Sequence, residues 1–177
     1  MGRSRYLCAM AIPREISQQF RTGHSVLWSR PEAPLLITSL PHANAPQNRQ
    51  MSVALAVAEV GLLTGYVQEI SDLMWDVLEH TEKELWLQVP GGRNVPDWVL
   101  NADGSINLVW ARTGPLQQLI HPTGKPGILW WLPSSEAEQK QVLAPVENVV
   151  TLPPAKEKAP AVRHMRLEPS GSVQILK

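Results

Sequence analysis

The sequence predicts an α+β fold in which helices pack on a small antiparallel sheet, followed by a proline-rich C-terminal tail. Apolar residues recur at helical spacing between residues 65 and 81, and polar residues cover the opposite side of that segment. Over residues 85–89, Leu and Val alternate with Trp and Gln, which is typical of a strand. Asp103-Gly104 between two apolar runs predicts a hairpin turn with positive φ.

The remaining elements follow from shorter signals. Pro13 stands where a first helical residue often lies, and Gly23 marks the end of that helix. Alanine is frequent over residues 51–60, which predicts another helix. Ser135 and Glu138 have the spacing of a capping box. The expected helices are residues 14–22, 51–60, 65–81 and 135–143, and the expected strands are residues 6–12, 35–40, 85–89, 98–100, 106–110 and 128–132.

This order of helices and strands matches a winged helix, with residues 90–105 as the wing. The predicted domain comprises residues 1–143. Residues 144–177 are rich in proline and charged residues, which predicts a linker or tail, with a terminal hairpin as the alternative for residues 162–176.

Composition predicts a cytoplasmic protein that does not span a membrane. Cys8 is the single cysteine, so no disulfide forms within the chain, and a reducing compartment is the simplest interpretation. The longest apolar stretch, residues 51–67, contains Glu59 and is too short for a bilayer.

A protein-interaction module is the function that the composition favours, as a subunit or accessory factor of a larger complex. The net charge is zero, only 18% of residues are charged, and there are seven tryptophans against one phenylalanine. Trp130 and Trp131 are adjacent on an expected strand, so they point to opposite sides of it. We predict another protein or a second copy of the chain as the partner, bound by Trp98, Trp130, Trp131 and Arg93.

Nucleic-acid binding by a winged-helix-like protein is the alternative. Residues 1–30 carry five arginines and one glutamate. The helix expected at residues 65–81 carries several acidic side chains, and these oppose direct contact with phosphate. The residues assigned to this alternative are Arg3, Arg5, Arg14, Arg21 and Arg93.

Residues 5–16 (RYLCAMAIPREI) resemble the first strand and helix of the 2H phosphoesterase, or RNA ligase-like, family. The resemblance implies two His-x-Thr motifs that act as acid and base. The chain has one, His121-Pro122-Thr123, while residues 36–38 (Leu-Ile-Thr) have leucine in place of the first histidine. One motif does not supply both acid and base, so a degenerate phosphoesterase is the second alternative, and the sequence favours a protein without catalytic activity.

No cofactor or metal site is predicted. The five histidines lie far apart in sequence, and no pair has metal-ligand spacing. Gly91-Gly92-Arg93-Asn94 lacks the lysine of a phosphate-binding loop. We therefore expect no catalytic residues, no cofactor and no metal.

Overall fold

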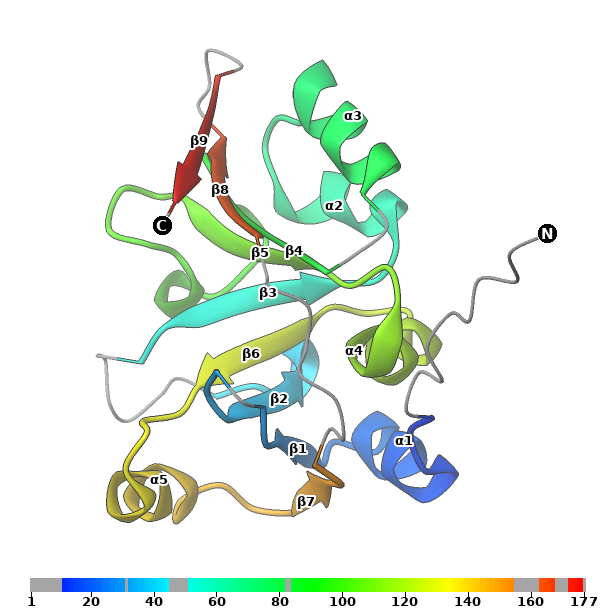
Figure 1. The fold of residues 1–177 in the computed structure, drawn as a ribbon, viewed down its shortest axis with the longest axis vertical. Coiled ribbons are helices and arrows are strands. Elements are labelled where there is room, and N and C mark those ends of the chain that lie inside the picture. Colours follow the sequence, from blue (N-terminus) through cyan, green and yellow to red (C-terminus); the bar gives the residue numbers. More distant parts are fainter. Residues whose placement is uncertain are drawn as a thin grey trace, which may run out of the picture.

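The computed structural model describes residues 11–30, 32–44, 51–81, 84–154, 163–167 and 172–176. These residues form one nine-stranded sheet with strand order β7-β1-β2-β6-β3-β5-β4-β8-β9 (Figure 1). The strands are β1 (Ser25–Trp28), β2 (Leu35–Ser39), β3 (Val53–Val57), β4 (Leu85–Val89), β5 (Ile106–Trp110), β6 (Gly127–Trp131), β7 (Val149–Leu152), β8 (Arg163–Leu167) and β9 (Val173–Leu176). The helices are α1 (Arg14–Arg21), α2 (Val60–Tyr66), α3 (Asp72–His80), α4 (Gly114–Ile120) and α5 (Glu136–Leu143), with 3-10 turns η1 (Leu40–His42), η2 (Asp97–Val99) and η3 (His121–Thr123).

The sheet is mixed, so the prediction of a small antiparallel sheet is wrong. Strand β3 is parallel to β5, β1 to β7 and β4 to β8, whereas the other neighbours are antiparallel. The winged-helix prediction is wrong for the same reason. A winged helix is built around its helices, but here the sheet runs through the molecule and the helices lie on its two sides (Figure 1).

Strand β3 lies where the sequence analysis predicted the helix over residues 51–60. Its five residues are all buried, and it pairs with β5 on one side and β6 on the other. Alanine favours a helix only weakly, and burial on both faces of a sheet overrides that preference. The alternation Val-Ala-Leu-Ala-Val is the strand signal that alanine content obscured.

Other local predictions have mixed outcomes. Strands β4 and β5 form as expected. The helix predicted at residues 65–81 forms only over Asp72–His80 (α3), because residues 67–71 lie between α2 and α3; the first turn of α3 is capped by Ser71 Oγ, which accepts from the Met74 N–H at 3.2 Å. Gly104 has the expected positive φ of 76°. Residues 97–99 form η2 instead of a strand, and α5 forms without a side-chain cap from Ser135. Of the strand expected at 6–12, only residues 11 and 12 are described, and they are not in a strand.

The region predicted as a tail contributes three strands to the sheet. Strand β7 is hydrogen-bonded to β1, and β8 to β4. Strands β8 and β9 pair as an antiparallel hairpin, which was the alternative for this segment. The boundary between residues 1–143 and 144–177 as separate units stays a prediction.

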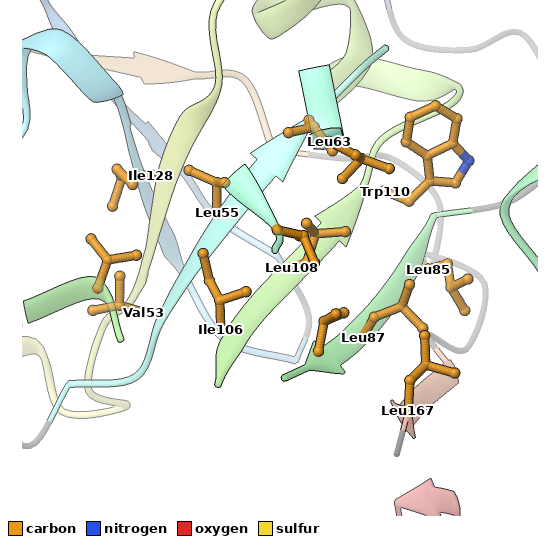
Figure 2. Packing of buried hydrophobic residues seen from close by; sticks show 14 of the residues in the cluster. Val53, Leu55, Leu63, Leu85, Leu87, Ile106, Leu108, Trp110, Ile128 and Leu167 are labelled. Atoms are coloured by element: carbon orange, nitrogen blue, oxygen red, sulfur yellow. The ribbon is translucent and has the colours of Figure 1, made fainter. Parts of the chain in front are cut away.

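The two faces of the sheet differ in what covers them. The core face carries the large apolar residues of β3, β4, β5 and β6, and it is packed by α2, α3, η2 and α5 (Figure 2). We call the opposite side the groove face. Helices α1 and α4 cover the part of it over β1, β2, β6, β7 and part of β3, through Phe20, Leu116, Leu119 and Ile120. The part over β4 and β5 is left uncovered by these helices.

Candidate functional site

The uncovered part of the groove face contains a cavity of about 290 Å³, which we call the indole groove. Two tryptophans from strands β4 and β6 stand on its sides. Its floor is formed by the central strands β3 and β5. The side chains that define it are Ser52, Ala54, Trp86, Gln88, Asn107 and Trp131.

Small residues on β3 make the groove possible. Ala54 and Ala56 point to the groove face and are fully buried. Because a methyl group projects little, side chains reach over this strand from the adjacent β6 and from β4, which lies beyond β5. Trp86 and Trp131 meet there with ring centroids 4.2 Å apart and ring planes at 65°. This edge-to-face contact is a favoured geometry for aromatic pairs.

Two carboxamides give the floor a polar edge. The Asn107 amide donates to the Val53 carbonyl at 3.0 Å and to Asn101 Oδ1 at 3.3 Å. Gln88 Nε2 donates to Ser105 Oγ at 2.9 Å. This bond fixes the orientation of the partly exposed Gln88 carboxamide, whose Oε1 is a hydrogen-bond acceptor.

The rim beside β8 carries one carboxylate and one guanidinium. The Ser105 hydroxyl and backbone N–H donate to Asp103 Oδ1, and Arg166 Nη2 lies 3.5 Å from Oδ2. The pKa of Asp103 is lowered, first by the Ser105 hydroxyl, then by the Ser105 N–H, with a smaller effect from Arg166. The rim therefore holds a balanced charge pair and adds no excess positive charge.

A second hollow of about 420 Å³ adjoins the indole groove. The two share Ser52 and Trp131. The second hollow extends to α5, where Glu138 and Gln141 contribute polar groups. Trp131 therefore separates two neighbouring cavities and is accessible from both.

The adjacent tryptophans point to opposite faces, as the strand geometry predicts. Trp130 lies on the core face, is 5% exposed, and stacks on Trp98 with centroids 5.1 Å apart and ring planes at 17°. Trp131 is half-buried on the groove face. Of the three tryptophans predicted to bind a partner, the structure brings only Trp131 to the groove, and their role in binding stays a prediction.

The three predicted arginines that the structure describes, Arg14, Arg21 and Arg93, do not lie on one surface. Arg14 and Arg21 are exposed on α1, at the β1–β2–β7 end of the sheet. Arg93 follows β4, is exposed, and donates to the Thr64 carbonyl. Arg3 and Arg5 lie outside the described residues. Their assignment to nucleic-acid binding stays a prediction.

Five of the six residues that define the groove were not predicted as site residues from the sequence: Ser52, Ala54, Trp86, Gln88 and Asn107. A signal for the last two was present, because each is a carboxamide inside an otherwise apolar strand. Polar side chains in a central strand mark a face that is not fully packed. The wing predicted at residues 90–105 already implies that β4 and β5 are neighbours, which the structure confirms, but the sequence did not show that the two carboxamides are paired in register.

The structure also describes the His-x-Thr motif on which the phosphoesterase resemblance rests. His121-Pro122-Thr123 forms η3 and not a strand, so it does not have the environment that the phosphoesterase resemblance implies. Among the described residues, no three His, Cys, Asp or Glu side chains gather as metal ligands do. Within the same residues, no helix has the length and hydropathy needed to cross a bilayer.

The topology defines an α/β fold with a large mixed sheet, which is the Sua5 type of fold. Escherichia coli YciO shares it with a TM-score of 0.66 and 16% identity, over 93% of this chain and 88% of YciO. Pyrococcus abyssi Sua5 complexed with L-threonine matches with a TM-score of 0.64 and 13% identity, over 87% of this chain and 50% of Sua5. Full-length HypF in its phosphate- and nucleotide-bound form matches with a TM-score of 0.61 and 12% identity, over 91% of this chain and 28% of HypF.

No protein-family model and no curated protein sequence matches the chain. At these identities the structural likeness establishes the fold alone. The neighbours nevertheless contradict the prediction of a non-catalytic adaptor, because the similar structures include Sua5 complexed with L-threonine and HypF in a phosphate- and nucleotide-bound form. The nucleic-acid alternative agrees better with these neighbours, although its winged-helix premise is wrong.

Proposed function

We propose that this chain binds a nucleobase in the indole groove, as part of a nucleotide or of a single-stranded nucleic acid. The observation that carries the proposal is the combination of two indoles with two fixed carboxamides in one cavity of about 290 Å³. A base has an aromatic face that stacks on indole and an edge that forms hydrogen bonds with amides. HypF, 28% of whose chain matches this fold, has been solved in a nucleotide-bound form, and this agrees with the proposed class of ligand.

The charges around the groove support recognition of the base more than of phosphate. Arg166 is paired with Asp103, and Arg30, beyond Trp86, is paired with Glu84. Proteins that bind a nucleic-acid backbone do so through cations that face phosphates, and their affinity falls steeply with salt. We therefore expect an affinity that depends only weakly on salt. A cytoplasmic location remains part of the proposal.

The test is calorimetric titration of the full chain with nucleosides, mononucleotides and single-stranded oligonucleotides. Trp131→Ala removes one stacking surface. A base stacked on an aromatic ring contributes roughly 1–3 kcal/mol, so we expect the affinity to fall about tenfold or more. The matched control is Trp75→Ala, because Trp75 is an exposed tryptophan on α3, which packs on the core face.

The affinities for the three ligand types distinguish whether the base is bound as part of a free nucleotide or of a single strand. Equal affinity for a mononucleotide and an oligonucleotide identifies a free nucleotide as the ligand. Binding that requires several linked nucleotides identifies a single strand. Absence of binding to every ligand, or an unchanged affinity in Trp131→Ala, would refute the proposal.

A further inference from the structure

An ion pair joins two strands that lie far apart in the sheet. Arg30 follows β1 and Glu84 precedes β4, and four strands separate β1 from β4. In a flat sheet, five strand spacings of about 4.8 Å would place these strands roughly 24 Å apart. Arg30 Nη1 and Glu84 Oε1 are nevertheless 2.9 Å apart. The sheet is therefore strongly curved, and this curvature brings the end of β1 and the start of β4 within reach of each other's side chains.

The ion pair is largely removed from solvent. The Arg30 side chain is 5% exposed and that of Glu84 is 15% exposed. The guanidinium lies over the Trp28 ring, with its central carbon 4.9 Å from the centroid. Glu32 Oε2 approaches Arg30 Nε to 3.6 Å from the exposed side. Because both side chains are largely buried, the guanidinium and the carboxylate keep one orientation, whereas the side chains of exposed ion pairs remain mobile.

Glu84 connects this ion pair to the wall of the indole groove. The same oxygen that binds Arg30 also accepts from Trp86 Nε1 at 2.9 Å. This bond sets the rotation of the Trp86 ring, which meets Trp131 edge to face. A continuous series of contacts thus runs from the end of β1, through Arg30 and Glu84, to the two indoles of the groove.

We propose that Arg30 and Glu84 are positioning residues for the indole groove: they hold Trp86 against Trp131 so that the stacking surface exists before a ligand arrives. Ligand binding then does not bear the entropic cost of ordering the indole. The value of this arrangement for binding rests on the proposed function. The orientation of Trp86 is a property of the free protein and is tested independently.

The first test is the near-ultraviolet circular dichroism of the free protein. Two indoles in contact give a signal that depends on their mutual angle, and Trp131→Phe and Trp86→Phe identify that signal. Glu84→Ala removes both the charge facing Arg30 and the acceptor for the Trp86 N–H, so we expect the signal to be lost. Glu84→Gln keeps an acceptor oxygen but no charge, and we expect the signal to be partly retained.

The second test is a double-mutant cycle on the affinity for the tightest-binding nucleoside or oligonucleotide. Glu84→Ala in the wild-type background is expected to weaken binding about tenfold. In the Trp86→Phe background, which lacks the indole N–H, the same substitution is expected to change the affinity less than twofold, because Glu84 acts through that group. The matched control is Glu59→Gln, which breaks the exposed Glu59–His121 pair and leaves both the signal and the affinity unchanged.

The outcomes distinguish this inference from the proposed function. If Glu84→Ala lowers the melting temperature but leaves the indole signal unchanged, the ion pair only stabilises the fold and the positioning inference is wrong. Equal effects of Glu84→Ala in the two backgrounds would also overturn it. If no base binds the wild-type protein, the proposed function fails, and loss of the indole signal in Glu84→Ala still supports the positioning of Trp86.

Discussion

The two faces of the central sheet are built from the same strands but have opposite characters. On the core face, β3, β4 and β5 present Val, Leu and Ile side chains that helices α2 and α3 bury (Figure 2). On the groove face, the intervening positions of these strands hold Ala54, Ala56, Trp86, Gln88, Val109 and Asn107. Because successive side chains of a strand alternate between faces, one short segment supplies both surfaces. The comparison indicates that the core face is filled by large apolar side chains, whereas the groove face combines buried small and apolar residues with the partly exposed side chains of Gln88, Asn107 and Trp131.

Alanine substitution of two adjacent residues of β5 is expected to give the largest difference in stability between the two faces. Leu108 is 1% exposed on the core face, and Leu108→Ala should lower the free energy of unfolding by about 2–5 kcal/mol through lost contacts and a cavity. Asn107 faces the groove, and Asn107→Ala should cost roughly 1 kcal/mol, mainly the hydrogen bond to the Val53 carbonyl. Urea denaturation measures both. Equal losses would show that the groove face is as important to stability as the core face.

The covered part of the groove face is expected to respond more moderately. A Cβ at Gly127 would lie 3.1 Å from Ile120 Cδ1, so Gly127→Ala requires the Ile120 side chain of α4 to shift by a few tenths of an ångström. We expect a loss of about 1–3 kcal/mol. Ile120→Val removes the contacting atom and should recover part of this loss in the double variant. Gly61→Ala is the control, because nothing lies within 4 Å of the added carbon; if both glycine variants behave alike, the helix is not closely packed on β6.

The rim of the indole groove is expected to give the smallest effect, visible only in the pH dependence. The pKa of Asp103 is lowered in the folded protein, so its carboxylate contributes stability above the ordinary pKa of about 3.9 and loses that contribution as pH falls through the lowered pKa. Asp103→Asn should therefore be slightly less stable than wild type at pH 7 and equally stable at the acid end. Melting temperatures from pH 2 to 7 check this, and a constant difference across the range would contradict it.

Local sequence patterns determined several elements correctly. The alternation over residues 85–89, the Asp103-Gly104 turn and the apolar run of β5 specify strands and a turn through the properties of adjacent residues. The opposite orientations of Trp130 and Trp131 follow from the strand repeat alone. Such features are predictable because backbone geometry fixes the direction of neighbouring side chains whatever the remainder of the chain does.

The tertiary structure decided which strands are neighbours, and therefore the site. Residues 51–60 have the alanine content of a helix, but pairing with β5 and β6 makes residues 53–57 a central strand. Arg30 and Glu84, which are 54 residues apart, meet only because the nine-stranded sheet curls. Trp86 and Trp131 form the groove for the same reason. Periodicity and propensity describe local segments, whereas strand order and curvature depend on long-range pairing and burial, which no local pattern contains.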